Sequence, residues 1–145
     1  SNIHLLGGQE MIEAASSTIK RLNSEMILVG VTILTSLNEN NLVEMGFNSS
    51  AEDLAIKLAK LGKQNGIDGV VCSIEDISGI KASLGGDFLS VTPGVRMLQD
   101  NGDQKRAGSI YDAIQFGTDF VVIGREITKA KNPEGVLKKI ESLIV

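Results

Sequence analysis

The sequence predicts an α/β fold built on a parallel sheet, and three observations support this prediction. Five short runs rich in β-branched and apolar residues alternate with segments of helical spacing. Most of these runs are unbroken, which is typical of strands that are buried on both faces. Polar and glycine residues come directly after the runs, where parallel α/β folds bind their ligands. Repeated strand, helix and strand units imply right-handed crossovers and therefore parallel strands.

The expected strands, in chain order, are residues 2–6, 26–32, 69–73, 88–92 and 120–124. Between them lie helix start signals. Ser36, Ser50 and Ser109 each stand three residues before an acidic residue, which is the capping-box pattern. Asn132 followed by Pro133 predicts the start of the last helix. Apolar residues at helical spacing over 51–64, with a glycine shortly after, predict an amphipathic helix in the middle of the chain.

Composition limits the kind of protein this can be. The chain has 145 residues, 42% of them hydrophobic and 22% charged, so we expect a single domain over residues 1–145. A net charge of −4 provides no general field for nucleic acid or an anionic membrane, and 3% aromatic residues with no Trp argue against base stacking. One cysteine permits no internal disulfide, and no secretion signal or membrane span is evident, so a cytoplasmic location is expected. No cluster predicts a metal or another cofactor.

The stretch VTPGVRMLQDNGDQKR, residues 91–106, gathers donors that suit a phosphate. Arg96 offers a planar fork and Gln104 a neutral amide. After the next expected strand, Gly124 permits close backbone approach and Arg125 offers a second guanidinium group. Taken alone, the loop 99–106 also fits a solvated turn. Two such loops after neighbouring strands instead favour a phosphomonoester site, which (β/α)8 barrels commonly build after their last two strands.

These motifs resemble those of the orotidine 5'-phosphate decarboxylase family. The similarity rests on VTPGVR, GDQKR and DFVVIGREIT, with IHLLGGQEMIEAA, VGVTILTSL and GIDGVVCS agreeing in order along the chain. It implies the parallel (β/α) units of a TIM barrel, incomplete, with about five of the eight strands. It also implies a role in pyrimidine biosynthesis, the decarboxylation of orotidine monophosphate to uridine monophosphate (UMP).

The resemblance assigns roles to individual residues. Arg96, Gln104 and Arg125, with the backbone N–H groups of Gly124 and Arg125, would hold the 5'-phosphate. Thr35 would lie near the pyrimidine and ribose. Pro93 and Val95 would form an apolar wall beside the base.

Two positions in these loops depart from the family's usual pattern. Met97 stands where proline is common, and Glu126 stands where proline is usual. The carboxylate of Glu126 is expected to weaken the positive field beside Arg125.

The family's catalytic Asp-x-Lys-x-x-Asp segment has no counterpart in this sequence. We therefore expect a truncated chain that holds the nucleotide but is inactive alone. The alternative is a non-catalytic remnant that binds phosphate at most. Because five strands cannot close an eight-stranded barrel, we expect self-association or association with an N-terminal half. Rearrangement into an open, flavodoxin-sized sheet is a further alternative.

Overall fold

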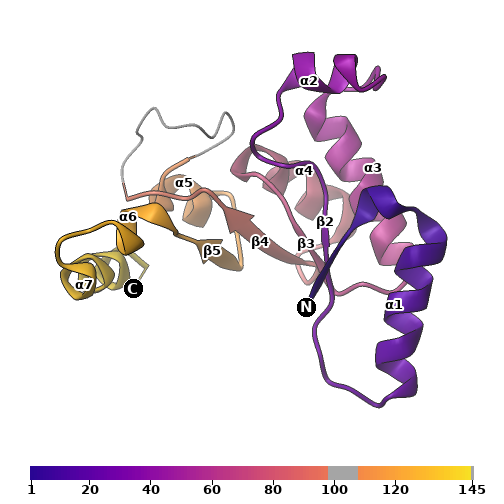
Figure 1. Cartoon of the computed structure of the whole chain (residues 1–145), viewed down its shortest axis with the longest axis horizontal. Coiled ribbons are helices and arrows are strands. Elements are labelled where there is room, and N and C mark those ends of the chain that lie inside the picture. Colours follow the sequence, from indigo (N-terminus) through magenta and orange to yellow (C-terminus); the bar gives the residue numbers. More distant parts are fainter. Residues whose placement is uncertain (98–107, 145) are drawn as a thin grey trace.

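The computed structural model describes residues 1–97 and 108–144, which form a five-stranded parallel sheet with helices packed against it. The strands are β1 (Asn2–His4), β2 (Val29–Val31), β3 (Gly69–Val71), β4 (Leu89–Pro93) and β5 (Phe120–Val122). Each strand begins within its expected run, and β4 ends one residue beyond its run, so the five predicted strands are confirmed. Their spatial order is β1-β2-β3-β4-β5 (Figure 1). This sequential order is that of a (β/α) barrel and differs from the flavodoxin-like order, which excludes the rearranged sheet.

The helices of the described residues follow the strands in turn. They are the 3-10 helix η1 (Leu5–Gly7), then α1 (Gln9–Arg21), α2 (Glu39–Glu44), α3 (Ala51–Gln64), α4 (Ile74–Leu84), α5 (Ile110–Gln115), α6 (Arg125–Thr128) and α7 (Pro133–Ile144). The amphipathic helix predicted over 51–64 is α3, with the same bounds. None of the helices in the described ranges is long and apolar enough to cross a membrane.

Three of the four predicted helix starts are confirmed. The Ser50 side chain accepts a hydrogen bond from the Asp53 N–H at 3.0 Å, and Ser109 forms a full capping box with Asp112. The Asn132 side chain accepts from the Gly135 N–H at 3.0 Å, directly before α7. The start predicted at Ser36 is wrong.

The helix that was expected to begin at Ser36 begins two residues later than the motif suggested. Asn38 caps α2, because its side chain and that of Asn41 each accept a hydrogen bond from the other residue's N–H. An Asn–Asn pair satisfies the same two donors as a Ser–Glu pair.

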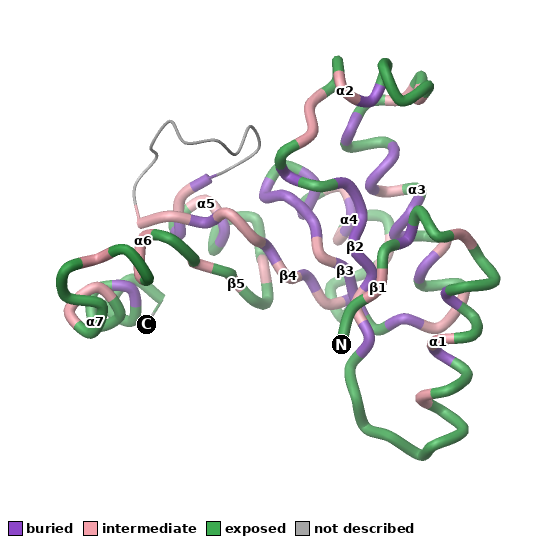
Figure 2. Tube along the Cα trace, viewed as in Figure 1, coloured by how far each residue is buried: buried purple, intermediate pink, exposed green. Residues whose placement is uncertain are grey.

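The prediction that most strands are buried on both faces is wrong, since burial alternates along β1, β4 and β5, and β2 and β3 alone have two adjacent buried residues among the described strands. One row across the sheet contains Gly30, Val70 and Ser90, all buried. The neighbouring row runs through Val71 and Val91 to Phe120, which is 53% exposed. Figure 2 shows the exposed ends of β5 in green. The helices therefore cover one face of the sheet, and the residues of the other face retain accessible apolar surface.

Close packing on the covered face requires a glycine in β2. A Cβ on Gly30 would overlap the side chains of Leu5 and Ile67, which are both buried. Gly62 on α3 makes room for the same Ile67 side chain. These contacts bring η1 and α3 against the sheet and so fix the ends of β1 and β2 relative to each other.

Candidate functional site

The carboxyl end of β4 carries Arg96, whose backbone is held on one side by the start of α5. The Arg96 N–H donates to the Gly108 carbonyl at 3.1 Å, and the Arg96 carbonyl accepts from the Ile110 N–H at 2.8 Å. Arg96 and Ser109 thereby form an isolated parallel bridge beyond the end of the sheet. Two backbone hydrogen bonds on one residue fix its φ and ψ angles, so the side chain projects from a defined position.

The segment after β5 carries Gly124 and Arg125, the residues expected to complete the phosphate site. Gly124 caps α6, and its carbonyl accepts from the N–H groups of Ile127 and Thr128 at 3.0 and 3.1 Å. Arg125 is the first residue of α6, and both it and Gly124 are exposed. The Ile127 side chain packs against the hydrophobic core and so anchors this short helix.

A hydrogen bond joins these two segments directly. The main-chain N–H of Met97 donates to Oε2 of Glu126 at 2.9 Å, across 29 positions of sequence. Met97 is adjacent to Arg96, and Glu126 is adjacent to Arg125. In Figure 1 α6 accordingly lies beside the carboxyl end of β4. The structure therefore brings the two arginine-bearing segments together, as the sequence predicted, although through a contact that the sequence did not indicate.

The residues expected near the base lie at or beyond the carboxyl ends of two different strands, β2 and β4. Pro93 is the last residue of β4, pairs with Val122 of β5 and is partly exposed. Val95 is 2% exposed and belongs to the hydrophobic core. Thr35 follows β2, is 8% exposed, and is separated from β4 by β3 in the sheet order. Gln104 lies outside the described residues.

Several other polar residues at strand ends have structural partners. The Thr32 hydroxyl donates to the Val71 carbonyl at 3.0 Å, and the Thr92 and Thr118 hydroxyl oxygens lie 2.6 Å apart. Ser73 caps α4, and its N–H donates to the Asp76 carboxylate. Thr32, Ser73 and Thr92 are at most 1% exposed. These residues stabilise strand and helix ends and were not part of the predicted binding set.

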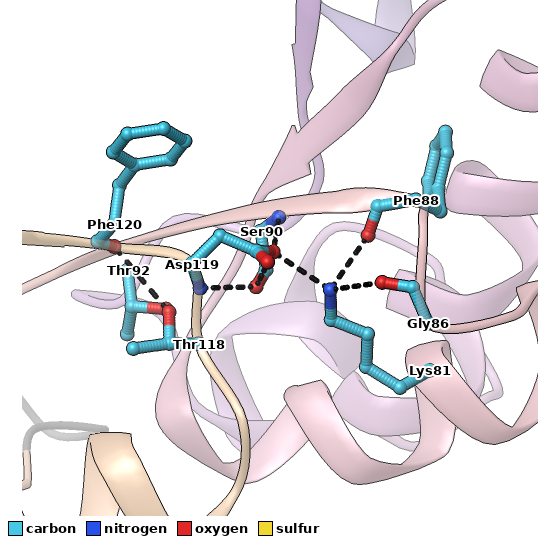
Figure 3. A network of polar contacts seen from close by, with 8 residues as sticks. All are labelled: Lys81, Gly86, Phe88, Ser90, Thr92, Thr118, Asp119 and Phe120. Atoms are coloured by element: carbon cyan, nitrogen blue, oxygen red, sulfur yellow. Dashed lines mark hydrogen bonds and ion pairs between the residues drawn. The ribbon is translucent and has the colours of Figure 1, made fainter.

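A polar network centred on Asp119 lies at the amino-terminal ends of β4 and β5, away from the candidate site (Figure 3). Asp119 Oδ2 accepts hydrogen bonds from Lys81 Nζ at 2.7 Å, from the Ser90 N–H at 2.7 Å and from the Ser90 hydroxyl at 2.8 Å. Lys81 Nζ also donates to the carbonyls of Gly86 and Phe88, both at 2.9 Å. All three ammonium protons therefore have acceptors.

The network lowers the pKa of Asp119. Burial acts to raise the pKa of this carboxyl group, but the hydrogen bonds from Lys81 and Ser90 and the charge of Lys81 together outweigh it. Asp119 directly precedes β5 and Ser90 lies near the start of β4. The network thus links the amino-terminal ends of β4 and β5. In parallel barrels, residues at this end of the strands typically serve stability and not catalysis.

Among the described residues, no group of three or more His, Cys, Asp or Glu side chains is arranged to hold a metal ion. His4, the only histidine in the sequence, is exposed at the end of β1. Cys72 is buried. The chemistry that the described residues of the candidate site offer is therefore anion recognition by arginine side chains.

Residues 1–140 match the model of the family described as orotidine 5'-phosphate decarboxylase / HUMPS. A protein of Neisseria meningitidis serogroup A named orotidine 5'-phosphate decarboxylase is 38% identical over 141 residues, covering 96% of this chain and 57% of that protein. A protein of Vibrio parahaemolyticus with the same name is 43% identical over 141 residues, covering 96% of this chain and 60% of that protein. The chain thus spans about three fifths of the length of these relatives.

Solved structures agree on the fold. The chain superposes on an orotidine 5'-phosphate decarboxylase from Lactobacillus acidophilus with a TM-score of 0.79 and 30% identity, covering 97% of this chain and 61% of that one. A Sulfolobus solfataricus enzyme, at 19% identity and a TM-score of 0.66, is similar in fold alone and is covered to 60%. The five strands and their helices correspond to an incomplete set of TIM-barrel (β/α) units.

Proposed function

Because the chain belongs to the orotidine 5'-phosphate decarboxylase / HUMPS family, we propose that it binds the 5'-phosphate of orotidine monophosphate and UMP. Arg96 and Arg125 are the proposed phosphate ligands, helped by the backbone of Gly124 and by Gln104. Thr35 and Pro93 are the proposed contacts of the nucleoside, whereas Val95, which was expected to join them, is 2% exposed and packs in the hydrophobic core. The reaction served is the decarboxylation of orotidine monophosphate in pyrimidine biosynthesis.

One observation carries this proposal. The 2.9 Å hydrogen bond from Met97 to Glu126 joins the residues that directly follow Arg96 and Arg125. Two guanidinium groups on adjoining segments suit a phosphate dianion, because each can donate two parallel hydrogen bonds to its oxygens. Binding energy at a phosphate remote from the reacting carbon can be used to organise an active site.

The chemical step requires groups that these 145 residues do not contain. No Asp-x-Lys-x-x-Asp segment occurs in the sequence. We propose that a polypeptide of these residues alone binds nucleotide and leaves orotidine monophosphate unchanged. The non-catalytic alternative predicts the same lack of turnover, and nucleotide affinity separates a working site from a remnant.

The accessible face of the sheet favours a further partner. Phe120 and Val122 are 53% and 48% exposed although both lie in a strand of the sheet. β1 and β5 also end the sheet without a neighbour on their outer sides in the described part of the chain. Apolar strand surface and unpaired strand edges favour association, so we propose self-association, with added (β/α) units from an N-terminal half as the alternative cover. Light scattering that reports a monomer at all concentrations would exclude self-association.

Calorimetric titration with UMP tests the binding site. We expect Arg125→Ala to weaken UMP binding by roughly 30-fold, because it removes a charge-assisted pair of hydrogen bonds worth about 2 kcal/mol. Arg21→Ala is the matched control, since Arg21 is exposed at the end of α1 and the variant has the same net charge. If the Arg125 and Arg21 variants bind UMP equally well, the proposed site is wrong.

Ultraviolet absorbance of orotidine monophosphate tests the assignment of the chemistry. Incubation with the 145-residue polypeptide is expected to leave the absorbance constant. Turnover by this polypeptide would show that its own residues perform the decarboxylation.

A further inference from the structure

We propose that Glu126 is a positioning residue that sets the spacing of Arg96 and Arg125, although its negative charge repels a phosphate. This inference rests on the proposed phosphate site and adds to it a residue that does not touch the phosphate. From sequence alone, Glu126 was expected to weaken the local positive field, and the positioning role adds a second effect of opposite sign.

Glu126 contacts the backbone of the segment after β4 directly. Glu126 Oε2 accepts from the Met97 N–H at 2.9 Å in a partly buried position. A main-chain donor is fixed by its neighbours, and Arg96, the residue before Met97, already has its N–H and carbonyl bonded to the start of α5. The carboxylate of Glu126 is therefore held against a rigid part of the backbone, and not against a mobile side chain.

The helix α6 has only four residues and little rigidity of its own. Ile127 packs against the core and α6 also contacts α7, but these packing contacts are less directional than a hydrogen bond. The bond of Glu126 supplies a directional contact, one residue from Arg125. Together with the packing of α6 against the core and α7, this bond orients α6 toward the end of β4.

The Glu126 carboxylate also contributes a negative charge beside the proposed phosphate site. A carboxylate beside two phosphate-binding arginines repels a dianion and so reduces affinity. A hydrogen bond that positions one arginine relative to the other increases affinity, because the two guanidinium groups need no rearrangement on binding. The two effects have opposite signs, and substitutions can separate them.

The test is a calorimetric titration of UMP into the wild-type chain, Glu126→Gln and Glu126→Ala. Glutamine keeps an acceptor oxygen for the Met97 N–H and removes the charge, so binding is expected to equal or exceed that of wild type. Alanine removes both, and we expect UMP binding about five-fold weaker than that of wild type. Glu141→Ala, an exposed position on α7, controls for net charge and is expected to bind as wild type or slightly tighter.

Met97→Pro provides an independent variant. Proline has no N–H to donate, so the hydrogen bond is lost although residue 126 is still glutamate. It is expected to weaken UMP binding to a similar degree, and adding Glu126→Ala to it is expected to cause no further loss. Thermal unfolding of each variant identifies any that fails to fold. If Glu126→Ala fails to fold, the comparison of Glu126→Gln with wild type still tests the proposal, because glutamine retains an acceptor for the Met97 N–H.

The outcomes are distinguishable. If Glu126→Ala and Glu126→Gln both bind UMP more tightly than wild type, the carboxylate acts only by repulsion and the positioning role is wrong. Equal affinities for wild type and both variants would also overturn it. If wild type binds no UMP at all, the proposed function fails, and the positioning role fails with it.

Discussion

Replacing Asp119 with alanine is expected to destabilise the folded chain, because one carboxylate oxygen is the acceptor of several hydrogen bonds. The carboxylate accepts from Lys81 Nζ, from the Ser90 N–H and from the Ser90 hydroxyl, all on one oxygen and all within 2.8 Å. Its side chain is 30% exposed and that of Lys81 is 16% exposed, so the ion pair is only partly screened by solvent.

The magnitude follows from the groups left without partners. Ser90 is fully buried, and leaving its main-chain N–H without an acceptor costs about 1–3 kcal/mol. The hydrogen bond to Lys81 contributes about 1 kcal/mol more, a modest figure because the ammonium keeps its bonds to the carbonyls of Gly86 and Phe88. We expect a total near 3 kcal/mol for Asp119→Ala. Asp119→Asn keeps an acceptor and should cost roughly half as much.

Urea denaturation followed by circular dichroism, at pH 7 and one protein concentration, measures these values. The matched control is Asp87→Ala, which removes the same charge from an exposed position in the connection between α4 and β4. The slope of unfolding free energy against urea should stay constant, so that the midpoints report stability. If the Asp119 and Asp87 variants agree within about 0.5 kcal/mol, the network does not stabilise the strands as argued.

Two further predictions concern the fold. Because the folded-state pKa of Asp119 is lowered, its contribution is fully present above the unfolded-state value and is lost as the pH falls through the folded-state value. The difference in unfolding free energy between wild type and Asp119→Asn should therefore shrink from pH 7 toward pH 3, and a constant difference would contradict the lowered pKa. Gly30→Ala should destabilise the chain by about 1–3 kcal/mol in the same urea assay, because the new methyl group overlaps Leu5 and Ile67. Stability equal to wild type would mean that this packing can relax without cost.

The parts of the fold that sequence predicted correctly depend on local signals. Apolar runs predicted all five strands, and side-chain caps predicted the starts at Ser50, Ser109 and Asn132. Ser36 was wrong because a competing cap at Asn38, two residues away, has an equally short-range partner. Burial on both faces was wrong because an unbroken apolar run does not say whether anything covers its second side.

The site was predictable only to the level of residue type and strand end. Arginines after the last two strands indicated adjoining segments, because carboxyl ends of neighbouring parallel strands meet. The bond between Met97 and Glu126 spans 29 residues, and the bond between Ser90 and Asp119 spans 29 as well. Such pairs depend on sheet register, which a single sequence does not specify. The joint departure of Met97 and Glu126 from the family pattern was the one available signal.

A crystal structure of this chain with UMP would show whether the segments after β4 and β5 share one phosphate. We expect a single phosphate group with its oxygens within about 3 Å of the guanidinium nitrogens of both Arg96 and Arg125. A phosphate held by only one of the two arginines, or bound elsewhere on the chain, would contradict it.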